Sequence, residues 1–124
     1  MKLHEEWLLK ANHDLRAAKL LKTDNDLLDT AIYHTQQCAE KSLKGFLAFK
    51  NREIPKTHHL KVLLECCISI NTEFSSLISE SVFLSPFATE FRYPDDILIP
   101  EPEDLQMAIV SAEVIYEFVV KLTK

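Results

Sequence analysis

The sequence contains a single glycine, at position 45, among its 124 residues. Glycine readily adopts the positive φ angles that tight hairpins and phosphate-cradling loops need at several positions. A β-sheet joined by short turns and a glycine-rich nucleotide loop are therefore both disfavoured. Long apolar runs are also absent, and the first 22 residues lack the apolar core of a signal peptide. We therefore expect a cytoplasmic protein that does not cross a membrane.

Basic residues are also in short supply. The chain has 14 lysines and arginines against 19 aspartates and glutamates, which gives a formal net charge of -5 and a pI near 5.5. Proteins that bind duplex nucleic acid neutralise phosphates with clustered basic residues. The overall charge disfavours a protein that binds duplex nucleic acid, although it does not exclude a local basic patch.

The three cysteines are odd in number, and none has metal-ligand spacing. Cys38, Cys66 and Cys67 each lie within a helical pattern, so we expect them to be small core residues. No nucleophile elbow, Walker loop or paired-carboxylate signature is present, which leaves hydrolase and kinase chemistry without support.

Apolar residues, 47% of the chain, recur at helical spacing along most of its length. A chain of this size can bury the core of one domain, residues 1–124. We expect helices over 2–21, 30–50, about 57–71, from about 74 with a break near Pro86, and about 101–122. This pattern predicts an all-α fold, an antiparallel up-and-down bundle of four long helices plus one shorter or broken helix.

Turn and cap residues mark the expected helix ends. Thr57 is the predicted N-cap of the third helix, and Ser85 the predicted cap of the segment restarted at Pro86. Residues 95–104 form an acidic, proline-containing loop. Glu101 and the carboxylates that follow it suit the start of the last helix.

The helix over 30–50 has two distinct faces, and we expect the rest of the chain to pack around it. Its apolar face holds Leu28, Ile32, Thr35, Ala39, Leu43 and Phe46, and its polar face holds His34, Gln37, Glu40, Lys41 and Lys44. Lysine ammonium groups and a glutamine amide can hold phosphate and a base edge. The alternative is a solvated face with an ordinary ion pair between Glu40 and Lys44.

Asp14 lies about 20° from Trp7 around the first helix, at the edge of its packing stripe. Buried polar groups are usually satisfied, so this carboxylate needs a partner, for which a lysine of the central helix is a candidate. A direct role in a binding site is the alternative.

Lys56, Thr57, His58 and His59 precede or begin the third helix, where free backbone donors and the helix dipole favour an anion. Adjacent histidines on a helix point about 100° apart, so we expect no metal site here.

Arg92 lies between Phe91 and Tyr93 near the end of the fourth helix. Its guanidinium can bind phosphate through two parallel hydrogen bonds, or it can bond helix-terminal carbonyls as a structural lock.

Four segments resemble the HEPN domain family in order and spacing over almost the whole chain. They are WLLKANHDLRAA at 7–18, YHTQQCAEKSLKGFLAFK at 33–50, PKTHHL at 55–60 and FRYP at 91–94. The pairing of AEKSLK with PKTHHL is fairly specific to the family, whereas the last helix matches only as a generic amphipathic pattern.

The resemblance implies an up-and-down bundle of about four long helices that is commonly dimeric and is encoded beside, or fused to, a minimal nucleotidyltransferase. It also implies nucleotide binding. We therefore expect a homodimeric partner of a nucleotidyltransferase, in a toxin–antitoxin-like pair, that takes a nucleotide or RNA as ligand and has no resident cofactor.

We expect six residues to serve the ligand: Lys41, Lys44 and Arg92 through phosphate, Gln37 through base or ribose, and Asp14 and His58 by orienting the others. Lys41, Lys44 and the start of the third helix should converge on an anion-sized hollow.

Other members of the superfamily are metal-independent ribonucleases and toxins, which use an arginine and a histidine four to six residues apart near a helical dimer interface. Arg52 and His58 have this spacing, but Pro55 lies between them and the pair falls in the second loop. Arg92 lies nearer the family's position, and no histidine follows it there. We therefore expect no ribonuclease activity. The alternatives are a ribonuclease toxin that uses Arg52 with His58 or His59 across a dimer, and a non-catalytic protein-interaction module.

Overall fold

The computed structural model describes residues 1–94 and 99–124, and within these ranges the chain is all-helical, as predicted. Residues 95–98 of the predicted acidic loop lie outside the described part. The α-helices are α1 (Leu3–Leu21), α2 (Leu28–Phe49), α3 (Leu60–Ile70), α4 (Ile78–Leu84) and α5 (Pro102–Leu122). Short 3₁₀ segments are η1 (Asn25–Leu27), η2 (Thr72–Leu77) and η3 (Ser85–Ala88).

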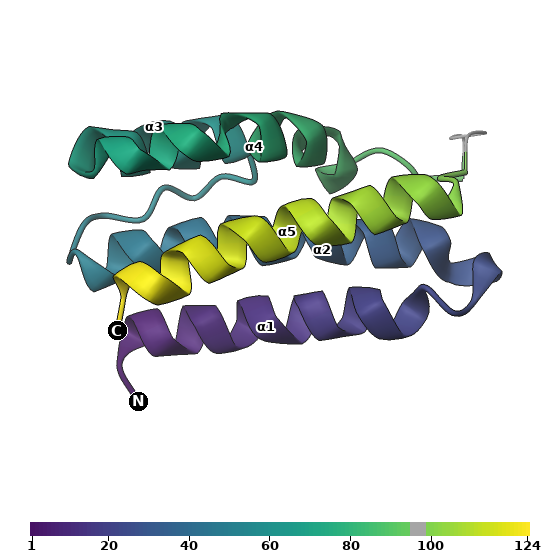
Figure 1. Ribbon diagram of the computed structural model, residues 1–124, viewed down its shortest axis with the longest axis horizontal. Coiled ribbons are helices and arrows are strands. Elements are labelled where there is room, and N and C mark those ends of the chain that lie inside the picture. The colour runs from purple at the N-terminus through teal and green to yellow at the C-terminus, as the bar shows by residue number, and fades with distance from the viewer. Residues whose placement is uncertain (95–98) are drawn as a thin grey trace.

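Helix α2 lies at the centre of the bundle, as its two-faced pattern predicted. It contacts α1, α3, α4 and α5. In Figure 1, α1 lies on one side of α2 and α5, and α3 and α4 lie together on the other side. The two termini lie at the same end of the bundle.

The loop over 50–59 folds back along α2 instead of leaving its end directly. Asn51 adopts a left-handed φ of 55°, a conformation that asparagine tolerates better than most residues, and the Arg52 N–H then donates to the Leu47 carbonyl at 2.9 Å. Further along, the Gln36 side chain donates to the His58 carbonyl at 3.0 Å. The start of α3 is thereby placed beside the middle of α2.

Both predicted N-caps are wrong. Helix α3 begins at Leu60 with His59 as its N-cap, while the Thr57 hydroxyl accepts the His59 N–H at 3.1 Å and so closes the turn before the helix. Ser85 is instead the C-cap of α4, and both its N–H and its hydroxyl donate back to the Ser81 carbonyl, the hydroxyl at 2.7 Å. Glu101 does precede α5 as predicted, in a reciprocal capping box with Asp104.

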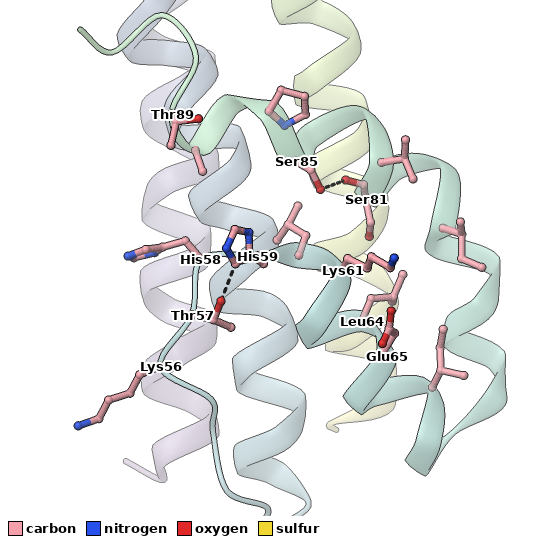
Figure 2. A pocket seen from close by; sticks show the side chains of 16 residues that line it. Lys56, Thr57, His58, His59, Lys61, Leu64, Glu65, Ser81, Ser85 and Thr89 are labelled. Atoms are coloured by element: carbon pink, nitrogen blue, oxygen red, sulfur yellow. Dashed lines mark hydrogen bonds between the residues drawn. The ribbon is translucent and has the colours of Figure 1, made fainter.

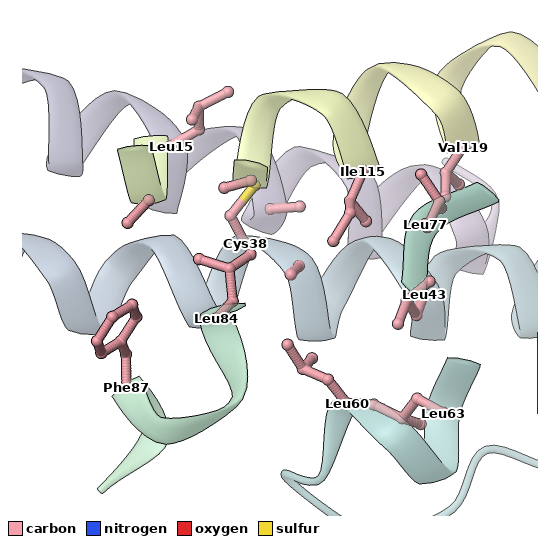
Figure 3. Packing of buried hydrophobic residues seen from close by; sticks show 14 of the residues in the cluster. Leu15, Cys38, Leu43, Leu60, Leu63, Leu77, Leu84, Phe87, Ile115 and Val119 are labelled. Carbon is pink, nitrogen blue, oxygen red and sulfur yellow. The ribbon is translucent and has the colours of Figure 1, made fainter. Parts of the chain in front are cut away.

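The core draws buried apolar side chains from every helix (Figure 3). Phe74 is fully buried, with its ring centroid 4.4 Å from that of Phe46 and 4.9 Å from that of Phe118. Cys38 and Cys67 are fully buried, as predicted, whereas Cys66 is only partly buried. Burial raises the pKa of both buried thiols to about 12, so they stay protonated.

The single glycine lies where α1 approaches α2 closely. A Cβ atom at Gly45 would lie 3.3 Å from Leu8 and 3.4 Å from the Cβ of Trp7. The absent side chain therefore lets the two helices pack without a gap. No helix in the described ranges is long and apolar enough to cross a membrane.

Candidate functional site

The polar face of α2 carries two clusters, each built on one buried carboxylate. We call them the Asp14 cluster, formed by Asp14, His34 and Lys41, and the Glu40 cluster, formed by Gln36, Gln37, Glu40, Lys44 and His58. The first joins α2 to α1, and the second joins α2 to the loop over 50–59.

In the Asp14 cluster, one carboxylate holds two side chains of α2. Asp14 Oδ1 lies 2.7 Å from His34 Nδ1, and Asp14 Oδ2 accepts from Lys41 Nζ at 2.7 Å. His34 and Lys41 are seven residues apart, so two helical turns bring them to the same face. The expected partnership between Asp14 and a lysine of the central helix is confirmed.

These contacts change the ionisation of Asp14, whose side chain is only 10% exposed. Burial raises the pKa of this carboxyl, but the hydrogen bonds from His34 and Lys41 outweigh burial and hold the pKa below its usual value. The carboxylate is therefore charged at neutral pH and fixes the positions of both partners.

In the Glu40 cluster, the carboxylate is more deeply enclosed, with a side chain 5% exposed. Glu40 Oε2 accepts from Lys44 Nζ at 3.1 Å, and Glu40 Oε1 lies 3.0 Å from His58 Nδ1. The Gln37 amide donates to Glu40 Oε1 at 3.3 Å and to Gln36 Oε1 at 2.8 Å. Such a network supplies the compensation that a buried charge requires.

The ion pair between Glu40 and Lys44 is thus present, but it lies on no solvated face. The side chain of Lys44 is only 10% exposed, and its ammonium lies 5.6 Å from the centroid of the Trp7 ring. Helix α1 and the loop over 50–59 cover this part of α2. The spacing of polar residues identifies a shared face without revealing which segments cover it.

Arg92 lies apart from both carboxylates. Its guanidinium carbon is 4.2 Å from the centroid of the Tyr33 ring, and Nη1 donates to the Ala88 carbonyl at 3.0 Å, which is the structural lock. The sequence alone does not single out Tyr33. Its ring also lies 5.9 Å from that of His34, a member of the Asp14 cluster.

A cavity lies beside the loop over 50–59. It has a volume of about 900 Å³ and is bounded by residues 56–59, α3, α4 and η3 (Figure 2). Of the six residues expected to serve a ligand, only His58 lines it. Arg52 is exposed in the same loop as His58 and belongs to neither cluster.

No group of three or more histidine, cysteine, aspartate or glutamate residues in the described ranges is arranged to hold a metal ion. The arrangement instead offers fixed N–H donors. Lys41 and His34 are partly exposed, at 26% and 29% of their side chains, and the His58 side chain is 74% exposed.

Comparison with known proteins shows two related structures and one family. The family model of the HEPN domain matches residues 4–122. The crystal structure of ST0689, an archaeal HEPN homologue, is 28% identical, with a TM-score of 0.77 over 100% of both chains. That of TT1696 from Thermus thermophilus is 23% identical, with a TM-score of 0.81 over 98% of each chain, and supports the fold alone. No curated protein matches the chain.

We predict that Asp14→Asn lowers the free energy of unfolding by about 1–3 kcal/mol at pH 7, because it removes a charged acceptor from Lys41 and His34. The pKa of Asp14 is lowered by folding, so its contribution is present above the pKa of the unfolded carboxyl and is lost as the pH falls through the folded value. Urea denaturation from pH 7 down to pH 2 should show the difference shrink below about pH 4. Glu117→Gln, at an exposed position on α5, is the control and should change little. A pH-independent difference would contradict this account.

Proposed function

Because the chain belongs to the HEPN domain family, we propose that it binds a nucleotide at the exposed edge of the Asp14 cluster and acts as the partner of a minimal nucleotidyltransferase. The observation that carries the proposal is the single carboxylate of Asp14, which holds an ammonium and an imidazole side by side at 2.7 Å each. Both groups are held in place before any ligand arrives, so binding would cost little side-chain entropy.

Pairing with Asp14 does not use up Lys41. A lysine ammonium has three N–H donors, and Asp14 takes one of them. Arg92, which lies over the Tyr33 ring, likewise gives one of its five N–H donors to the Ala88 carbonyl. The remaining donors suit phosphate oxygens, with Lys41 and Arg92 as the direct contacts.

The deeper residues have supporting roles in this proposal. Lys44 is too enclosed for more than a peripheral phosphate contact, and it keeps Glu40 compensated. The Gln37 amide nitrogen is engaged by Gln36 and Glu40, which leaves its carbonyl oxygen for a base or ribose group. Glu40 holds Nδ1 of His58, so the other ring nitrogen faces outward.

We predict that nucleoside triphosphates bind the purified chain and that Lys41→Gln weakens binding at least about tenfold, equivalent to about 1.4 kcal/mol. Isothermal titration calorimetry with the four ribonucleoside triphosphates measures this directly. Asp14→Asn keeps the ammonium but releases it from the carboxylate that orients it, so it should weaken binding less than Lys41→Gln does, and Lys121→Gln on α5 is a remote control. No heat with any nucleotide at millimolar concentration, or equal loss in Lys41→Gln and Asp14→Asn, would count against a phosphate contact.

We predict that the chain forms a homodimer and co-purifies with the nucleotidyltransferase encoded beside it. Apolar side chains remain exposed along one stripe of α5, at Met107, Val110 and Val114, and such a stripe suits a protein interface. Light scattering after size-exclusion chromatography should give twice the chain mass, and Val110→Glu should give the monomer. Leu20→Glu, at an exposed position on α1, is the matched control. A monomeric wild-type chain that captures no nucleotidyltransferase would overturn the partnership.

Metal-independent RNA cleavage is the second candidate, and the contact between Glu40 and His58 favours it. A buried carboxylate that fixes one ring nitrogen leaves the other free for general acid–base work, and Arg52 lies in the same loop. We predict that the chain leaves RNA intact in the presence of EDTA. Cleavage that is abolished by both His58→Ala and Arg52→Ala would establish the ribonuclease instead. If neither RNA nor nucleotide engages the chain, the protein-interaction module is the function that remains.

A further inference from the structure

We propose that the space between α3 and α4 is a second ligand site, which takes an amphipathic organic anion: an alkyl or aryl body with one carboxylate or phosphate head group. We call it the α3–α4 cleft. It is bounded by residues 56–59 and α3 on one side and by α4 and η3 on the other (Figure 2). The proposal does not depend on nucleotide binding at the Asp14 cluster.

The size and lining of the cleft suit a small organic molecule. Its volume of about 900 Å³ lies in the range of known ligand pockets. Leu60, Leu64 and Ile68 line it from α3 at one-turn intervals, and Ile78 and Val82 face them from α4. Ile78 is 50% exposed and Val82 68% exposed, so an apolar ligand body would remove both from water.

A buried hydroxyl in the wall of the cleft lacks a partner. Ser81 is 3% exposed, and its Oγ has no hydrogen-bond partner among the described residues. Its carbonyl is engaged by the Ser85 hydroxyl, so Ser85 has already given its proton. Figure 2 shows Ser81 facing Lys61 and Leu64 across the cleft. A head group placed there would satisfy a hydroxyl that otherwise costs stability.

The first turn of α3, which also lines the cleft, has further donors. The Leu63 N–H bonds to the His59 carbonyl at 3.2 Å, whereas the N–H groups of residues 60–62 precede the first intrahelical bond. These N–H groups and the positive end of the helix dipole favour an anion. Together with Ser81 on the opposite wall, they form the proposed binding position of the head group, which we call the seat.

The charges around the seat limit the head group to a single anionic group. Lys61 and Glu65 both line the cleft, one helical turn apart, so the positive charge of the first nearly balances the negative charge of the second. Lys56 and His58 border the cleft, but their side chains extend away from the space between α3 and α4 (Figure 2). A triphosphate would bring more negative charge towards Glu65 than Lys61 offsets.

The test uses the full chain and four probes: octanoate, octyl phosphate, 1-octanol and ATP. Calorimetry should show octanoate or octyl phosphate binding at least tenfold more tightly than 1-octanol, which has the same body without the charge. Amide NMR shifts should concentrate at residues 60–64 and 78–82. Binding of octyl phosphate alone would identify phosphate as the head group, and binding of octanoate would show that a carboxylate suffices; either result supports the site.

Three variants separate the site from general hydrophobic adsorption. Ser81→Ala removes only the unpartnered hydroxyl, so it should fold at least as stably as wild type and bind the anionic probes about tenfold more weakly. Val82→Asp, at an exposed position, should abolish binding by placing a charge against the apolar body. Ser69→Ala, an exposed serine of α3 outside the cleft lining, is the control and should bind normally.

The proposal is overturned if the anions bind no better than 1-octanol, or if Ser81→Ala and Val82→Asp bind as wild type does. It is also overturned if ATP occupies the cleft more tightly than the single-headed probes. The Lys41→Gln variant tests nucleotide binding at the Asp14 cluster independently. It should leave the binding of octanoate and octyl phosphate unchanged.

Discussion

The contact between Glu40 and His58 is the constraint on which much of this arrangement depends. Glu40 is almost fully enclosed, so its charge must be compensated locally, and Lys44 and His58 provide that compensation. Because His58 belongs to the returning loop, the requirement holds that loop against the middle of α2. The start of α3 and the mouth of the cleft are placed as a result.

The Asp14 and Glu40 clusters follow the same plan. Each consists of a buried carboxylate shared between a lysine of α2 and a histidine, and each ties α2 to a neighbouring segment, α1 in one case and the loop over 50–59 in the other. Several residues in the segments that resemble the family therefore hold helices and loops together. Their remaining donors and exposed edges determine what they can offer a ligand.

Local periodicity was enough to predict most of the helices, and it placed Asp14 where a lysine of the central helix was a candidate partner. The first two helices were expected to start at residues 2 and 30, and they start at Leu3 and Leu28. The agreement is close because apolar spacing depends on each segment alone. The N-cap of α3 was missed because the His58 carbonyl is bonded by Gln36, which lies 22 residues away in the chain. The stacking of Arg92 on Tyr33 likewise joins residues far apart in the chain, and nothing local signals it.

Gly45 shows how one missing side chain can set the alignment of two helices. A methyl group at this position would lie 3.3 Å from the Leu8 side chain and 3.4 Å from the Cβ of Trp7, so the two helices are in close contact here. The same alignment brings Asp14 within reach of Lys41, roughly two turns further along α1. A side chain at position 45 would force Leu8 and Trp7 to shift by a few tenths of an ångström, on the helix that also carries Asp14.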